Sequence, residues 1–204
     1  MISRIIRKIK SILCKRINNG ANNIINVECT IKRGKISIWG NNNRVDVAGS
    51  CQWEDAEIVI HGDNNHVIIE SDVRLIGPCR IEIFDNATLI MTQNCGIRGV
   101  SISITDGCVE IGERAMFSYG INIRNHDSHR VFNIGDTLPC NLPSDIKIGK
   151  HVWICQNVTI LKGVEIGDDS VLAFGSVITK SCPSNCIMAG NPAKIVKQGI
   201  TWDY

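Results

Sequence analysis

The chain lacks the features that would assign it to several large classes of protein. Its net charge is only +2 over 204 residues, so nothing overall indicates nucleic acid as a partner. It contains no stretch of the ~18 apolar residues that a membrane-spanning helix requires, and its first residues do not resemble a cleavable signal peptide. We therefore expect a soluble protein that forms one folded domain.

A disulfide framework is also missing, although the sequence contains 10 cysteines. No C-x-x-C pair occurs among them, and they are scattered through positions that face inward in the surrounding pattern. We interpret them as reduced thiols that fill a core as small apolar groups in a cytoplasmic protein. Cys182 and Cys186 are close neighbours, but two buried thiols are favoured there over a metal site, so no metal is expected.

What the sequence does contain is an aliphatic residue at every sixth position of its C-terminal third. The residues in register are Ile148, Ile154, Ile160, Ile166, Leu172 and Ile178. Period six fits neither a helix nor a flat strand, but it suits a coil with flat sides of six residues. Three sides per turn predict strands stacked roughly 4.8 Å apart. The predicted stacked pairs are Ile148 with Ile166, Ile154 with Leu172, and Ile160 with Ile178.

The N-terminal half has a looser repeat. Between Asn22 and Ser103, aliphatic pairs recur without a strict period, and the runs G-N-N-N at 40–43 and G-D-N-N at 62–65 are typical of turns. Their offset of 22 residues predicts one coil per repeat with longer corners. These polar runs could form a sugar-binding wall, although turn chemistry alone explains them.

Residues 1–19 have isoleucines on one helical face and mostly lysine and arginine on the other, which predicts a basic amphipathic helix. This helix could cap the open end of the coil, lie on an anionic membrane surface, or do both. The predicted parts are the helix at 1–19, a coil domain at 20–198 with a loop at 124–145, and a C-terminal tail at 199–204.

The six-residue period stops at Arg124 and resumes at Ile146. The intervening segment is polar and contains two histidines and two prolines. An insertion of this kind must project outward, and such loops on rigid scaffolds commonly carry the chemistry. We therefore predict one protruding active-site loop.

The pattern V-W-I-x-x-x-V-T-I-L-x-G-V-x-I-G-D-x-S-V, followed by G-S-V-I-T-K and A-G-N-P-A-K, resembles the hexapeptide-repeat acyltransferases. The irregular early coils look like those of the polysaccharide O-acetyltransferase branch. The resemblance implies an all-β fold, a left-handed parallel β-helix, whereas crossover statistics alone would favour a right-handed coil. It also implies a homotrimer that uses acetyl-CoA and a carbohydrate acceptor, in the cytoplasm or at the inner face of the membrane.

The loop sequence R-N-H-D-S-H-R-V-F resembles the I-R-x-x-D-x-H segment of polysaccharide O-acetyltransferases, whose last histidine is the general base. The resemblance assigns that role to His129 and places Trp153, 24 residues later, beside the thioester. An imidazole with an unperturbed pKa of about 6.5 can remove a proton from a sugar hydroxyl. His126 is the competing candidate, and both histidines could simply be surface residues. Asp127 or Asp145 could orient the imidazole, and the sequence does not choose between them.

The later motifs imply a donor site, since coenzyme A in this family lies along a groove between two subunits. The residues nominated by alignment are Gly175, Ser176, Thr179, Lys180, Pro192 and Lys194. Lysine side chains suit phosphate charge. Two positions depart from the family pattern: Phe174 stands where alanine is usual, and Cys155 replaces the glycine of W-I-G.

The leading interpretation is an acetyl-CoA-dependent O-acetyltransferase. Its acceptor would be a hydroxyl of a bacterial surface polysaccharide, in capsule or lipopolysaccharide, or of its sugar precursor, with direct transfer. One alternative is an N-acetyltransferase acting on an amino sugar. A second is a trimeric zinc carbonic-anhydrase-like coil with His126, His129 and His151 as ligands, against which the G-N-P-A-K segment argues. A third is a non-catalytic scaffold.

Overall fold

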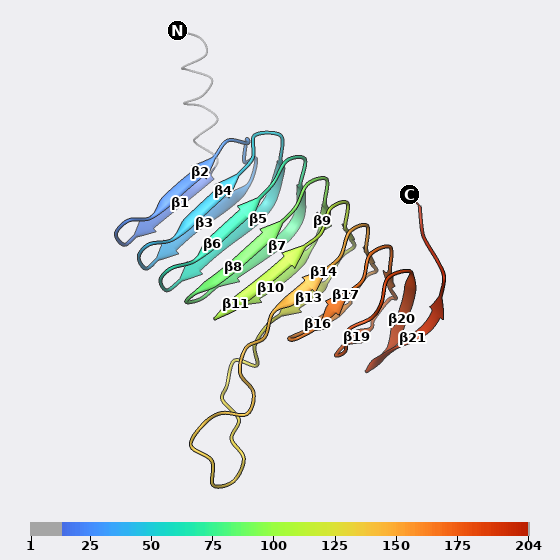
Figure 1. Cartoon of the computed structure of the whole chain (residues 1–204). Coiled ribbons are helices and arrows are strands. Elements are labelled where there is room, and N and C mark those ends of the chain that lie inside the picture. Colours follow the sequence, from blue (N-terminus) through green and yellow to red (C-terminus); the bar gives the residue numbers. More distant parts are fainter. Residues whose placement is uncertain (1–13, 204) are drawn as a thin grey trace.

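The computed structural model describes residues 14–203, which form a parallel β-solenoid without helices in that range (Figure 1). Strands from successive coils stack along the axis, so their backbone groups pair between coils. One sheet takes a single strand from each of its seven coils. The predicted all-β solenoid is therefore confirmed.

The coil has three faces. The first carries β10 (Val100–Ile104), β13 (Ile121–Arg124), β16 (Thr159–Leu161) and β19 (Val177–Ile178). The second carries β9 (Gly96–Arg98), β12 (Met116–Phe117), β15 (Trp153–Ile154), β18 (Val171–Leu172), β20 (Cys186–Gly190) and the antiparallel β21 (Ala193–Gln198). The third carries β2 (Ile24–Val27), β4 (Arg44–Val47), β6 (His66–Ile69), β8 (Ala87–Met91), β11 (Gly107–Ile111), β14 (Ile146–Ile148) and β17 (Glu165–Ile166).

The early coils have longer strands, namely β1 (Cys14–Asn19), β3 (Gly34–Trp39), β5 (Gln52–His61) and β7 (Arg74–Ile83). Of these, β5 and β7 span two faces, whereas β1 and β3 pair along the first face. The first part of β7 pairs with β9 and its last part pairs with β10. In this coil a single strand therefore continues around the corner. In the later coils the same corner separates two short strands.

The interior is a set of aliphatic columns that run the length of the coil. Pairing between successive coils builds one continuous column of buried isoleucines, formed by Ile36, Ile58, Ile81, Ile102, Ile123, Ile160 and Ile178. The three pairs predicted from the six-residue period are also aligned. The spacing of aliphatic residues thus determines the register, because each one must meet its counterpart in the next coil.

The corners of the early coils contain an asparagine ladder. The Asn65 Nδ2 group donates to Asn43 Oδ1 (2.8 Å), and Asn65 Oδ1 accepts from the backbone N of Ala87 (2.9 Å). Asn64 lies at a φ of 60°, in the left-handed region that asparagine tolerates. The ladder repeats at the predicted offset of 22 residues. Asn43 and Asn65 are buried, so these two side chains hold the corner together, whereas Asn42 and Asn64 of the same runs are exposed.

The helix predicted over residues 1–19 is wrong for residues 14–19, which form β1. This strand pairs in parallel with β3, and the partner strand supplies hydrogen bonds that outweigh the local helical pattern. Residues 1–13 lie outside the described range. Within the described range, no helix is long and apolar enough to cross a membrane.

The cysteines from Cys29 to Cys186 are free thiols. Burial raises the pKa of Cys95 to about 11 and that of Cys182 to about 12, so both stay protonated as core fillers. Cys140 is different, because it is exposed on the loop between β13 and β14 and does not face inward as predicted.

Candidate active site

The loop between β13 and β14 projects away from the coil, as the break in the period predicts (Figure 1). It carries His129, whose side chain is exposed beside a cavity of about 400 Å³. His126 and Asn141 line the same cavity, together with Thr105 and Asp106 from the adjoining coil.

Asn141 connects the two limbs of this loop. Its Nδ2 group donates to the carbonyl oxygen of His129 (2.8 Å) and to Asp127 Oδ2 (2.9 Å), while its Oδ1 accepts from the backbone N of Val131 (2.7 Å). Lys162, which follows β16 in the coil, donates to Asp127 Oδ2 and to the Asn141 carbonyl oxygen (2.9 Å). The backbone of His129 is therefore fixed to the scaffold.

The hydrogen bonds of Asn141 and Lys162 described above form a clamp on the loop, and they also shift a pKa. The Lys162 ammonium, with help from the Asn141 amide, lowers the pKa of Asp127 below its ordinary value. Asp145 Oδ1 accepts from the backbone N of Cys108 (2.7 Å). Both carboxylates proposed to orient the His129 imidazole are therefore engaged elsewhere.

His126 has both ring nitrogens engaged at the base of the loop. Its Nδ1 accepts from the backbone N of Ser128 (3.1 Å), so the ring proton is on Nε2, which donates to Ser103 Oγ (2.9 Å). Burial lowers its pKa, and the charges of Arg124 and Lys162 lower it further. These contacts indicate that His126 anchors the base of the loop to the coil. The exposed imidazole of the loop is that of His129.

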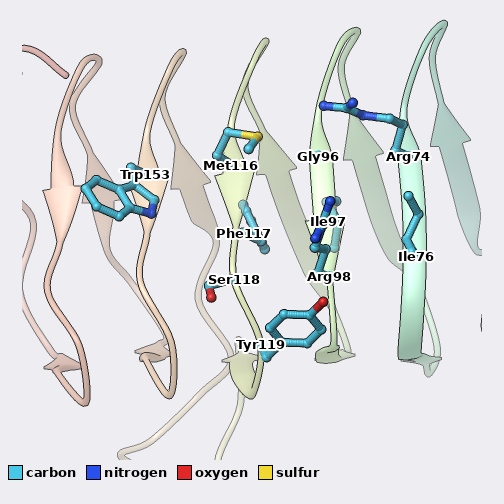
Figure 2. Close-up of a pocket in the computed structure, with 10 residues that line it drawn as sticks. All are labelled: Arg74, Ile76, Gly96, Ile97, Arg98, Met116, Phe117, Ser118, Tyr119 and Trp153. Carbon is cyan, nitrogen blue, oxygen red and sulfur yellow. The ribbon is translucent and has the colours of Figure 1, made fainter. Parts of the chain in front are cut away.

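A second cavity of about 350 Å³ lies on the second face of the coil (Figure 2). Side chains alternate along a strand, so Ile154 points inward and Trp153 outward, where its indole is 41% exposed. Figure 2 shows Trp153 at one end of this cavity and Arg74 at the other. Arg98 and Tyr119 also line it, and both are exposed.

The residues nominated for the donor lie at the C-terminal end of the coil. Gly175 has a φ of 68°, and no atom lies within 4 Å of where a Cβ would be, so its backbone faces open space. Lys180 and Lys194 are exposed, as are Thr179 and Pro192. The hydroxyl of Ser176 is buried and accepts from the backbone N of Gly190 (3.2 Å).

These donor-site features suit a long phosphate-bearing ligand. Within residues 14–203, the ammonium groups of Lys180 and Lys194 are outside the salt bridges, whereas Lys147 and Lys162 are paired with carboxylates. Exposed lysines can meet phosphate charge, and open backbone at a glycine lets a thin chain approach. Ser176 can offer such a ligand only its backbone.

The single chain does not bring His129 and Trp153 to one cavity, since each lines a different one. The other residues around Trp153 are not marked by any motif in the sequence. Arg74 and Arg98 come from irregular coils where no motif singles them out. Trp202 belongs to the tail, and its position next to Trp153 results from a long-range contact.

Comparison with known proteins places these features in context. The family described as bacterial transferase hexapeptide (six repeats) matches residues 145–180. A polysialic acid O-acetyltransferase of Neisseria meningitidis is 34% identical over 187 residues, which cover 90% of this chain and 86% of that protein.

Two solved structures superpose on most of the chain. The crystal structure of the polySia-specific acetyltransferase NeuO has a TM-score of 0.88 at 31% identity and covers 94% of this chain and 89% of its own. That of the polysialic acid O-acetyltransferase OatWY has a TM-score of 0.85 at 32% identity, with 94% and 91% covered. Both neighbours are left-handed β-helices, which supports the hand predicted above.

Proposed function

Because the chain belongs to the hexapeptide-repeat acetyltransferases, we propose that it transfers acetyl from acetyl-CoA to a hydroxyl of a bacterial surface polysaccharide. The acceptor would be a capsule or lipopolysaccharide chain, or its sugar precursor. The observation that carries the proposal is the exposed His129 imidazole on a loop whose backbone is clamped to the coil.

In the proposed mechanism His129 is the general base. Its imidazole removes the proton from the acceptor hydroxyl as that oxygen attacks the thioester carbonyl, and then returns the proton to the departing thiolate. The clamp through Asn141 restricts the conformations of the loop. A more mobile loop would place the His129 imidazole in reach of the acceptor hydroxyl for a smaller fraction of the time. The His126 ring is engaged with Ser103 and Ser128, which leaves it unsuited to this task.

We propose that the donor lies against the C-terminal coils. Gly175 and Ser176 would present backbone to the pantetheine, with Thr179 and Pro192 beside it. Lys180 and Lys194 would bind the phosphates. Trp153 would flank the thioester.

Exchanging either lysine for glutamine should raise the KM for acetyl-CoA severalfold and leave kcat nearly unchanged.

The site is proposed to be completed between copies in a homotrimer. The loop exposes apolar side chains, namely Val131, Phe132, Ile134, Leu138 and Leu142, which a neighbouring copy could cover. Trimerisation would bring the His129 of one copy to the Trp153 of the next. Co-assembled His129→Ala and Trp153→Ala chains should then show more activity than either variant shows alone. A fully active monomer at micromolar concentration in light scattering would contradict the trimer.

For the acceptor, we propose an acidic polysaccharide. The exposed guanidinium groups of Arg74 and Arg98 line the same cavity as Trp153, and two relatives that superpose on most of the chain are named for polysialic acid. Labelled acetyl-CoA offered with acidic polysaccharides, neutral polysaccharides, amino sugars and nucleotide sugars tests this directly. Transfer to amino sugars alone would favour N-acetylation instead.

We further propose that the enzyme acts in the cytoplasm and that its basic N-terminal segment contacts the inner face of the membrane. The described part of β1 starts at Cys14, so deletion of residues 1–13 keeps all of its residues. Deletion of residues 1–13 should weaken binding to anionic vesicles, and binding of the whole chain should fall steeply with added salt. Unchanged vesicle binding would contradict membrane contact.

A further inference from the structure

The C-terminal segment runs back along one corner of the coil after β21 ends. The Ile200 backbone N donates to the Asn185 carbonyl oxygen (3.1 Å), and Asn185 Nδ2 donates to the Ile200 carbonyl oxygen (2.9 Å). The next residue, Thr201, donates from its hydroxyl to Asp169 Oδ1 (3.4 Å). Successive residues of this segment therefore contact successive coils, and each coil is nearer to Trp153 than the one before.

The segment ends on His151 with two contacts. Trp202 Nε1 donates to the His151 carbonyl oxygen (2.7 Å). The indole also stacks on the His151 imidazole, with ring centroids 4.1 Å apart and planes 11° from parallel. The imidazole is fixed in turn, because its Nδ1 lies 2.7 Å from Asp169 Oδ1. Trp202 is thus held by the coil from two directions.

The indole of Trp202 lies beside that of Trp153, with ring centroids 5.9 Å apart and planes tilted by 41°. Trp153 is exposed on a strand of two residues and lines the cavity, whereas Trp202 is outside the cavity's lining. An exposed indole has several rotamers available to it, and a neighbouring ring that occupies part of that space reduces their number.

We propose that Trp202 is a positioning residue that holds the Trp153 indole in the orientation that lines the cavity. This inference rests on the proposed function, in which Trp153 contacts the reacting groups. The tail at residues 199–203 then connects the Trp153 side of the cavity to the last coils. Trp202 itself touches neither donor nor acceptor.

A double-mutant cycle tests this inference with the full chain, acetyl-CoA and the polysaccharide that accepts label in the acceptor assay proposed above. We expect Trp202→Ala to lower kcat/KM by about tenfold, since small displacements of positioning groups cost one to two orders of magnitude. In a Trp153→Ala background, the same substitution should cost less than about twofold, because the two residues act as one unit. Trp202→Phe keeps a ring against His151 and should retain activity within about threefold of wild type.

The controls separate positioning from folding. Trp39→Ala removes an exposed indole from the early coils and should leave kcat/KM unchanged, while Tm is measured for every variant. If Trp202→Ala does not fold at the assay temperature, Asn185→Ala takes its place, because it releases the tail one step earlier. It should show the same dependence on Trp153.

The outcomes distinguish this inference from the proposed function. An equal loss from Trp202→Ala in both backgrounds would show a merely structural tail and overturn the inference. A severe loss from Trp153→Ala beside a fully active Trp202→Ala would overturn it while leaving the proposed function intact. Full activity in Trp153→Ala would refute the proposed role of Trp153, and the inference with it.

Discussion

The early and the late coils form the same three-faced solenoid with different corners. In the early coils, buried asparagines such as Asn43 and Asn65 bond from coil to coil, and aromatic rings stack on the outside, with Trp39 and His61 only 5.1 Å apart. In the late coils the repeat shortens to 18 residues, as the pairing of Ile148 with Ile166 shows, and the corners have no comparable buried asparagine ladder within the described residues.

This difference assigns stability to one end of the coil and chemistry to the other. At the corners of the early coils, the buried asparagine side chains are hydrogen-bonded from one coil to the next. The late coils and the loop leave Trp153, Phe174 and His129 exposed to solvent. Substitutions in the early ladder should therefore change stability without changing chemistry, and substitution of the exposed His129 should do the reverse.

The largest expected effect is on catalysis. His129→Ala should lower kcat by about a hundredfold to ten thousandfold, the usual range for loss of a general base, with little change in the affinity for acetyl-CoA. His126→Ala is the matched control and should keep most activity, with at most a severalfold rise in the KM for acceptor. Steady-state kinetics at saturating acetyl-CoA measure both. A crippled His126→Ala beside an active His129→Ala would reverse the assignment.

The next effect belongs to the early coils. Asn65→Ala removes two buried hydrogen bonds and leaves the backbone N of Ala87 without its acceptor, so it should lower the free energy of unfolding by about 1–3 kcal/mol. Its kcat should stay near that of wild type. Asn26→Ala, at an exposed position with one hydrogen bond to Asp46, is the control and should change stability by less than about 0.5 kcal/mol. Denaturant titration measures both. A loss of activity in folded Asn65→Ala would contradict the separation of tasks.

A smaller effect is expected at the loop clamp. Lys162→Met removes the ammonium that bonds Asp127 and the Asn141 carbonyl oxygen, so kcat/KM should fall by about tenfold as the His129 backbone loosens. Lys147→Met breaks an exposed pair with Glu165 and is the control. Surface pairs of this kind contribute about 0–1 kcal/mol. Equal activity in the two variants would show that the clamp does not position the base.

The smallest effect concerns pH. The pKa of His126 is lower in the folded chain than its ordinary value of 6.5, mainly because of burial, so the unfolded chain binds the proton first. The stability contributed by neutral His126 is complete above about pH 6.5 and declines as the pH falls from there toward the lower folded pKa. Tm measured against pH should show this decline, and His126→Gln should reduce it. An identical pH dependence in the variant would contradict it.

The architecture could be predicted from the sequence because the six-residue period is itself the geometry of the coil. Ile154 meets Leu172 because both must be inside and one turn apart. The loop was equally visible as a break in that period. In contrast, the pattern of residues 1–19 misled at its end, since residues 14–19 gain a partner strand 20 positions away.

The site was predictable only where a motif carries it. The histidine of D-S-H identified His129, but local sequence does not show that Asn141 bonds the carbonyl oxygen of His129 12 residues away. Still less does it show that Trp202 reaches a residue 51 positions earlier. Contacts of this kind depend on where the coil places its corners. The donor residues stay predictions, because family motifs alone assign them.

The isoleucine column passes from Ile123 directly to Ile160, although 37 residues separate them in sequence. The coil thus continues as though the loop were not there. Lengthening such a loop costs only about 0.6 kcal/mol for each doubling of its length. The exposed stretch from 132 to 138 can therefore change in length or sequence without disturbing the coil. A lineage, or an engineer, could vary it while His129, the scaffold and the donor end keep their places.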